Sequence, residues 1–254
     1  MFLTKDNQIK WRKMGWATLI VAMLVFAGIF VFDQSLFLFL RQFNCSAWMV
    51  LDKIFAPKIW IFVSGIAVLV FCANKCAKTD CEFLNVKHKK NPFVFVQNFF
   101  ENIRTNNAFL IFCSVLGAGV AVKVLKTFIG RARPIFFEAL DMTGFFPPST
   151  DWAFNSMPSG HATVGFAGLV MIGMLAPKYK PLTWGMAILV AISRVAVGAH
   201  WPSDVIFGAF IGMVCADIVK SVLKKIEILE LGRNINSALV PINDFSRDID
   251  YYKV

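Results

Sequence analysis

The sequence predicts an all-α membrane protein whose chain crosses the bilayer six times. Three observations lead to this prediction: the composition, the length of the apolar runs, and the placement of cations between them. Of 254 residues, 57% are hydrophobic and only 17% are charged. Ala108–Leu125 carries a single charge, and a hydrocarbon core is spanned by about 20 apolar residues. Soluble domains instead show short apolar groups that alternate with polar ones.

Six apolar segments reach or approach the length of a membrane span. They lie at Trp16–Phe32, Ile59–Ala73, Ala108–Leu125, Ser159–Ala176, Leu182–Val197 and Val205–Leu223. No cleavage pattern follows the first of these runs, so we predict that it is an anchor rather than a removed signal. The spans define one membrane domain, residues 1–225, which is followed by a C-terminal tail, residues 226–254.

Cations gather at alternate ends of the predicted spans. They precede the first span and follow the second, fourth and sixth, at Lys5, Lys10, Arg12, Lys13, Lys75, Lys78, Lys87, Lys89, Lys90, Lys178, Lys180, Lys224 and Lys225. The positive-inside rule places these groups, both termini and the tail in the cytoplasm. This topology, with one further cluster on the opposite face, explains the net charge of +10. The charge is therefore no argument for a nucleic-acid partner.

Other patterns predict structural roles. One cysteine–histidine group fits no standard zinc-site spacing, and we predict reduced thiols there; its members are Cys72, Cys76, Cys81 and His88. Asn91–Arg104 has apolar residues at helical spacing, which favours an interfacial helix on the cytoplasmic face. Gly208 and Gly212 form a small-xxx-small pattern, which lets membrane helices approach one another closely.

The connections on the predicted outer face hold most of the remaining polar residues. The third span ends in KTFIGRARP, the fourth begins with PSGH, and SRVAVGAHWPSD joins the fifth to the sixth. These segments contain two of the three histidines of the chain. Their candidate site residues are Lys126, Arg131, Arg133, Ser159, Gly160, His161, Arg194, His200 and Asp204. Charged groups beside hydrocarbon are costly, so this concentration indicates a functional site.

The chemistry of these segments suits a phosphate. A helix that starts at Ser159 and Gly160 offers free backbone N–H groups and the positive end of the helix dipole to an anion. Three cations, Lys126, Arg133 and Arg194, add positive charge. A phosphate monoester with nearly two negative charges would balance such a cluster, whereas a single carboxylate would leave it overcharged.

Two histidines and an aspartate suggest how that phosphate reacts. Pro202 fits the first turn of a helix, so Trp201 is predicted to be the cap and Asp204 the third helical residue. From there the Asp204 carboxylate can reach back to His200, fix its tautomer and make the other ring nitrogen a better nucleophile. His161 is then available as a general acid.

Each of these residues also has a structural interpretation. A lone histidine near a membrane interface is commonly a hydrogen-bonded structural residue, and arginines at an outer helix end can bind lipid headgroups. The functional interpretation is favoured because three separate segments on one predicted face all supply chemistry suited to phosphate.

At these residues the chain resembles the type 2 phosphatidic acid phosphatase superfamily, whose three motifs occur here in order and with the expected spacing. They are Lys126-x6-Arg133-Pro134, Pro158-Ser159-Gly160-His161 and Ser193-Arg194-x5-His200-x3-Asp204. The resemblance implies hydrolysis of a phosphomonoester or diphosphate through a phosphohistidine, without a metal or other cofactor. It implies that His200 attacks phosphorus, Asp204 orients it, and His161 protonates the leaving oxygen.

The resemblance also implies which groups hold the phosphate: Lys126, Arg133, Arg194 and the amides of Ser159 and Gly160. Arg131 lies outside the motifs. Arg131 could contact a second phosphate or a headgroup, but the favoured interpretation is that it is a solvated neighbour of the site.

A lipid phosphate in the outer leaflet is the expected substrate, and the aromatic loop Phe136–Phe154 is placed to admit it. Similar enzymes of the bacterial inner membrane, with sites that face the periplasm, act on lipid A, undecaprenyl diphosphate, phosphatidylglycerophosphate or phosphatidic acid. The motifs do not choose among these lipids or assign an oligomeric state. A lipid phosphotransferase and a non-catalytic headgroup-binding protein remain alternatives.

Overall fold

The computed structural model describes residues 1–85, 103 and 106–244. Within these residues the chain forms helices and two isolated β-bridges, and no strand. In order, the helices are α1 (Trp11–Ala27), the π-helix η1 (Gly28–Phe32), α2 (Asp33–Arg41), α3 (Ser46–Ile54), α4 (Pro57–Asn85), α6 (Asn107–Ile129), α7 (Pro134–Leu140), the short η2 (Trp152–Phe154), α8 (Gly160–Leu175), η3 (Pro177–Tyr179), α9 (Lys180–Ala196) and α10 (Pro202–Asp244). The predicted all-α membrane fold is confirmed.

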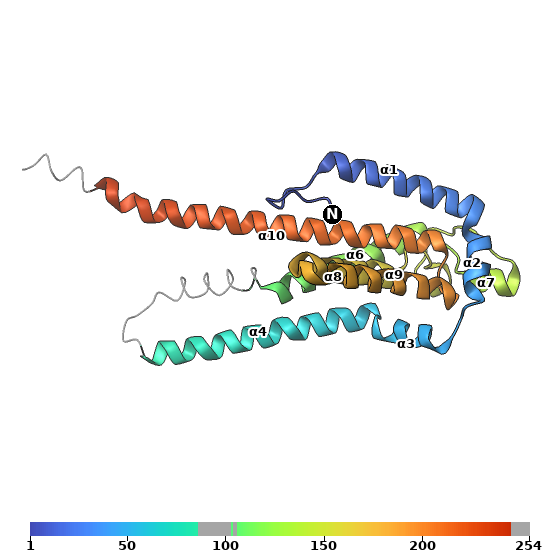
Figure 1. Ribbon diagram of the computed structural model, residues 1–254, viewed down its shortest axis with the longest axis horizontal. Helices are drawn as coiled ribbons and strands as arrows, with labels where there is room; N and C mark the ends of the chain where they lie inside the picture. The colour runs from blue at the N-terminus through green and yellow to red at the C-terminus, as the bar shows by residue number, and fades with distance from the viewer. Residues whose placement is uncertain (86–102, 104–105, 245–254) are drawn as a thin grey trace, which may run out of the picture.

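Helix α8 is the centre of the bundle. It packs against α10, α9 and α6, between the long helices α10 and α4 (Figure 1). Its sequence is apolar on every side, and Val164, Ala167 and Met171 are fully buried. A helix that is apolar all round is stable only where neighbours cover it. The burial of α8 therefore follows from its sequence.

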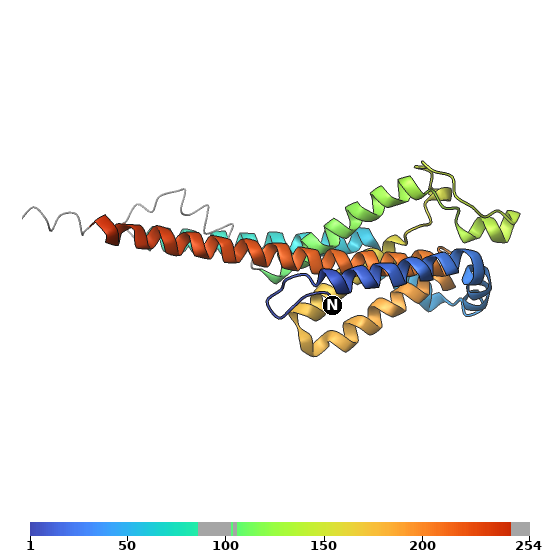
Figure 2. The same cartoon turned by 90° about the horizontal axis from the view of Figure 1, so that it is seen from above.

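The helix ends that carry the polar motifs lie together at one end of the molecule. In Figures 1 and 2 this end holds α2, α7 and the start of α10, whereas the far end of α10 extends well beyond the bundle. Local signals set these boundaries. Gly130, with a left-handed φ of 60°, ends α6. Pro202 occupies the first position of α10, as predicted. Such signals are common at helix termini.

Four helical runs among the described residues are long and apolar enough to cross a membrane: Trp11–Arg41, Ser46–Lys75, Asn107–Ile129 and Pro202–Leu229. Two further predicted spans correspond to α8 and α9, which have only 16 and 17 residues. Each predicted segment is thus largely helical. The count of six crossings stays a prediction.

Several predicted boundaries differ from the structure. The first helical run continues through η1 to Arg41 instead of ending at Phe32, because a π-turn carries the chain onward without a break. Helix α10 extends to Asp244, past the predicted start of the tail at residue 226. The predicted interfacial helix Asn91–Arg104 lies outside the described residues, apart from Ile103.

Two glycines explain how closely α10 approaches α8. A Cβ atom at Gly208 would lie 2.7 Å from the Ser159 carbonyl oxygen and 2.9 Å from Thr163 Oγ1. A Cβ atom at Gly212 would overlap the Thr163 carbonyl oxygen and lie 2.9 Å from Phe166 Cβ. Only glycine allows this separation of the backbones, which confirms the predicted packing role.

We expect Gly212→Val to destabilise the bundle, because the new side chain overlaps the backbone of α8. Overpacking of this kind costs about 1–3 kcal/mol. Thermal unfolding in detergent measures the loss. Gly117→Val is the matched control, since a Cβ at Gly117 meets nothing within 4 Å. An equal loss of stability in both variants would show that helix propensity, rather than the α8–α10 contact, causes the effect.

Candidate active site

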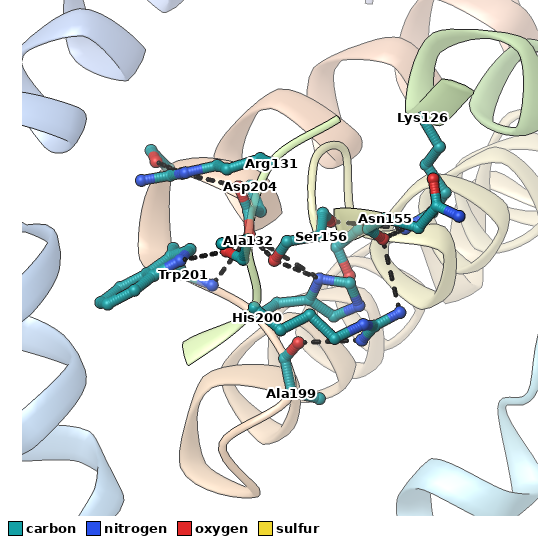
Figure 3. A network of polar contacts seen from close by, with 12 residues as sticks. Lys126, Arg131, Ala132, Asn155, Ser156, Ala199, His200, Trp201 and Asp204 are labelled. Carbon is teal, nitrogen blue, oxygen red and sulfur yellow. Dashed lines mark hydrogen bonds and ion pairs between the residues drawn. The ribbon is translucent and has the colours of Figure 1, made fainter. Parts of the chain in front are cut away.

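The three predicted motif segments meet at the polar end of the bundle. Figure 3 shows Lys126 of the first motif and His200 and Asp204 of the third around Asn155 and Ser156, which precede the second. The Ser159 amide donates a hydrogen bond to the Asp204 carbonyl oxygen at 3.0 Å, which joins the starts of α8 and α10. Lys126 Nζ, in the last turn of α6, donates to the carbonyl oxygens of Asn155 and Ser156. These contacts bring the ends of three helices to one site.

Arg133 is held by the backbone of two loops. Its Nε donates to the Trp152 carbonyl oxygen at 2.9 Å and its Nη1 to the Ala199 carbonyl oxygen at 3.0 Å, as Figure 3 shows for Ala199. The guanidinium also lies over the Trp152 ring, 4.5 Å from its centroid. Burial lowers the pKa of Arg133 to about 10. The side chain therefore remains a fixed cation at neutral pH.

The start of α8 and Arg194 present buried groups that lack partners. Ser159 is fully buried, and its hydroxyl makes no hydrogen bond within the described residues. Arg194 is 6% exposed, and its Nε also has no hydrogen-bond partner there. Such groups are rare in folded proteins and call for an explanation. A hydroxyl, a guanidinium and a helix N-terminus are all suited to an oxyanion.

His200 and Asp204 are close but do not form the direct hydrogen bond that the spacing predicts. Their nearest atoms, Nδ1 and Oδ2, are 3.8 Å apart. The Ser156 hydroxyl donates to Asp204 Oδ2 at 2.5 Å and lies 3.5 Å from His200 Nδ1. Asp204 Oδ2 also accepts from the Trp201 amide at 3.0 Å. The carboxylate reaches back as predicted, but it caps the helix and meets the imidazole largely through Ser156.

The surroundings of His200 favour its unprotonated form. The ring is 3% exposed, and this burial is the main reason that its pKa lies well below the ordinary value of 6.5. Three cations and His161 lower the pKa further: Lys126, Arg133, Arg194 and His161. Because Nδ1 faces Ser156 and Asp204, the neutral ring leaves Nε2 free to act as a nucleophile.

Arg131 is not the solvated neighbour that the sequence favoured. It is 5% exposed, and both of its terminal nitrogens are engaged by protein groups. Nη1 lies 2.6 Å from Asp204 Oδ1 and Nη2 lies 2.7 Å from Asp33 Oδ2. Burial disfavours its charge, but the two carboxylates outweigh burial and raise the pKa of Arg131. The sequence offered no partner for it, because Asp33 is remote in the chain.

Three further contributors were not predicted. Ser156 and Asn155 precede the second motif, and nothing in their spacing distinguishes them from ordinary loop residues. Asp52, on α3, forms ion pairs with Arg194 and with His161, whose Nε2 lies 3.1 Å from Asp52 Oδ1. An aspartate in a short amphipathic helix resembles a surface residue, so only the folded chain reveals this contact.

Within the part of the chain that the structure describes, no cluster of three or more histidine, cysteine or acidic side chains could hold a metal ion. Cys76, Cys81 and His88 lie outside the described side chains.

Residues 107–227, which include all three motifs, match the model of the PAP2 superfamily. This segment of the chain belongs to the type 2 phosphatidic acid phosphatase superfamily. A lipid A 1-phosphatase of Rhizobium etli is 42% identical over 102 residues, which cover 40% of this chain and 44% of that protein. An undecaprenyl-diphosphatase of Sulfolobus acidocaldarius is 37% identical over 92 residues, which cover 35% and 42%.

The matches thus span less than half the length of these two curated relatives. Among solved structures, the crystal structure of Aquifex aeolicus LpxE aligns with a TM-score of 0.44 and 21% identity, over 75% of this chain and 95% of that one. That superposition is too loose to transfer any detail of the site.

We expect Asp52→Asn to lower KM for an anionic substrate several-fold, because the carboxylate competes with a phosphate for Arg194 and His161. Steady-state kinetics with a soluble phosphomonoester measures the change. Asp141→Asn, an exposed acid at the end of α7, is the control and should leave KM unaltered. A fall in kcat with an unchanged KM would contradict competition and would indicate that Asp52 instead supports proton donation by His161.

Proposed function

We propose that this protein is a membrane-embedded lipid phosphate phosphatase that works through a phosphohistidine on His200. The observation that carries the proposal is the convergence of a neutral, buried imidazole with three cations and a helix N-terminus. Lys126, Arg133 and Arg194 all act electrostatically on His200, and the Gly160 amide at the first position of α8 is a further donor. The Ser159 amide does not have the predicted phosphate-binding role, because it donates to the Asp204 carbonyl oxygen. Donors fixed in place before reaction stabilise the charge that develops on a transferring phosphoryl group.

The reaction proceeds in two balanced steps. His200 Nε2 forms a bond to phosphorus while the bond from phosphorus to the lipid oxygen breaks, and His161 gives that oxygen a proton. A water molecule then attacks the phosphohistidine, His161 accepts a proton from it, and the P–N bond breaks to release inorganic phosphate. In both steps the cations hold the phosphoryl oxygens. The Ser156–Asp204 pair stabilises the positive charge on the imidazole.

A phosphorylated lipid of the outer leaflet is the proposed substrate, and lipid A phosphate is the first candidate. The support is the resemblance of the motif region to proteins named lipid A 1-phosphatase. Undecaprenyl diphosphate and phosphatidylglycerophosphate follow, because proteins named for their hydrolysis also match. The site lies at the ends of two apolar runs long enough to cross a membrane, Asn107–Ile129 and Pro202–Leu229, which suits a substrate that reaches it from the bilayer.

The test is phosphate release from purified protein across a panel of these lipids, in detergent with EDTA. We expect release to survive the chelator, because protein cations occupy the place that a metal would take. We expect no turnover by His200→Ala on any substrate. Activity that is abolished by EDTA and restored by a divalent ion would refute the metal-free mechanism. Transfer of labelled phosphate to a second lipid, in place of release, would identify a phosphotransferase.

The two histidines should respond differently to the leaving group. His161→Ala should lose about 10²–10⁴-fold in kcat on a lipid alkoxide, which needs a proton to leave. The loss should shrink sharply on p-nitrophenyl phosphate, whose leaving group needs none, while His200→Ala stays inactive. Rescue of His200→Ala, or equal rescue of both, would mean that the two roles are reversed.

We further propose that the protein lies in a bacterial inner membrane with the site on the periplasmic face. In a variant without native cysteines, a cysteine at exposed Thr150 should react with an impermeant maleimide in intact cells. A cysteine at Tyr179, which is 53% exposed, should react only after the membrane is opened. The reverse labelling pattern would place the site in the cytoplasm.

A further inference from the structure

Asp204 belongs to a buried group of three charged residues. Arg131 joins Asp204 Oδ1, at 2.6 Å, to Asp33 Oδ2, at 2.7 Å. The three side chains are all almost completely buried. Figure 3 shows the Arg131 guanidinium against Asp204, beside His200 and Ser156. We call Asp33, Arg131 and Asp204 the charge triad.

Ser203 completes the hydrogen bonding of the triad. Its amide donates to Asp33 Oδ1 at 2.9 Å and its hydroxyl donates to Asp33 Oδ2 at 2.5 Å. Arg131 Nη1 in turn donates to the Ser203 hydroxyl at 2.7 Å. Breaking a buried ion pair is costly because it leaves an unpaired charge. Each carboxylate of the triad is therefore fixed by more than one partner.

The backbone is shaped to bring Asp33 to this position. The π-helix η1, Gly28–Phe32, ends immediately before Asp33, and π-turns inside helices frequently occur at functional sites. A Cβ atom at Gly28 would lie 2.7 Å from Ser203 Cβ and 3.2 Å from Asp33 Oδ1. The first membrane helix thus approaches α10 closely at the point where its acid enters the bundle.

The charge of the triad matters to His200. One guanidinium between two carboxylates leaves a net negative charge, whereas Arg131 alone would neutralise Asp204. The charged or titratable groups that bear on the imidazole are otherwise cations or potential cations, namely Lys126 of α6, Arg133, His161 of α8 and Arg194 of α9; the remaining acid, Asp52 of α3, pairs with Arg194 and His161. Formation of a phosphohistidine places positive charge on this ring, so a negative neighbour is required.

We propose that Asp33 and Arg131 are positioning residues for the reaction at His200. Arg131 holds the Asp204 carboxylate so that Oδ2 faces Ser156 and the imidazole. Asp33 holds Arg131 and keeps the triad negative, so that Asp204 still supports charge on the ring. This inference rests on the proposed phosphohistidine mechanism, although neither residue belongs to the three motifs.

Single variants of the two residues should shift the pH dependence in opposite directions. Asp33→Asn removes negative charge, so the imidazole is harder to protonate. In the pH profile of kcat/KM, the acid limb should move to lower pH. The value of kcat should fall about 10-fold, the lower end of the loss seen when a residue that orients a metal ligand is replaced. Arg131→Gln leaves the Asp33 and Asp204 carboxylates without the cation between them. The pKa of the His200 imidazole and of the two carboxylates should therefore rise. The acid limb of this variant should move to higher pH.

The double variant and a matched control separate charge from structure. Asp33→Asn with Arg131→Gln removes one charge of each sign, and its acid limb should return toward that of the unmodified protein. KM should change little in any of them, because the triad does not contact the phosphate. Asp217→Asn removes a carboxylate on α10 that is 1% exposed and pairs with the Met1 ammonium. It should lower Tm without moving the acid limb.

A second measurement does not depend on activity. The chain has three histidines, so NMR of protein labelled at histidine resolves His200 once His88→Gln and His161→Gln variants assign the signals. Arg131→Gln should raise the protonated fraction of His200 at pH 5, and Asp33→Asn should not. Acid limbs that move together, or an unchanged His200 signal in Arg131→Gln, would overturn the role of the triad. Failure of every lipid in the panel with the expected NMR result would instead refute only the proposed function.

Discussion

The Asp204 carboxylate, fully buried at the start of α10, is the group on which the rest of the site depends. Its oxygens accept from the Arg131 guanidinium, the Ser156 hydroxyl and the Trp201 amide. These donors come from the segment after α6, the loop before α8 and the cap of α10. An ion in this position is tolerable only when it is paired and hydrogen-bonded. The same contacts that satisfy the charge therefore hold the three motif segments together.

The packing of α8 determines where this polar site lies. Because α8 is apolar on every side, it occupies the centre of the bundle, and its N-terminus opens among the ends of α6, α9 and α10. Gly208 and Gly212 let α10 approach until the Ser159 amide can donate to the Asp204 carbonyl oxygen. Close contact between the helix backbones thus fixes the spacing between the N-terminus of α8 and His200, the proposed nucleophile.

The electrostatics of the site combine two opposed requirements. Phosphate binding needs several cations close together, and burial together with those cations lowers the pKa of His200. In the proposed reaction, transfer of the phosphoryl group places positive charge on the same ring, which the cations disfavour. Asp204 supplies the negative charge that balances this positive ring. Its carboxylate accepts from the Ser156 hydroxyl, which lies next to the imidazole, and makes no direct hydrogen bond to the ring. Arg131 partly neutralises the Asp204 carboxylate, and Asp33 limits this effect because it shares the same guanidinium.

Much of this protein was determined by the sequence alone. Long apolar runs leave no soluble alternative, so the helical membrane class follows from composition. The motif residues could be placed at one site because the positive-inside rule put their three segments on one face of the membrane. Pro202 gave the start of α10 from a local signal. Such signals act over a few residues, so they survive in any tertiary context. The reach of Asp204 back toward its own cap was predictable for the same reason.

The tertiary structure decided which side chains face one another across the bundle. Asp33 and Asp52 are 98 and 142 residues from their arginine partners, and no local pattern in the sequence connects such distant positions. Ser156 comes between Asp204 and His200 because a loop from another segment passes there, which spacing within SRVAVGAHWPSD does not reveal. Arg131 was predicted to be a solvated cation because the sequence gives its charge but not its burial. Pairing across helices depends on how whole helices pack, and only the folded chain contains that information.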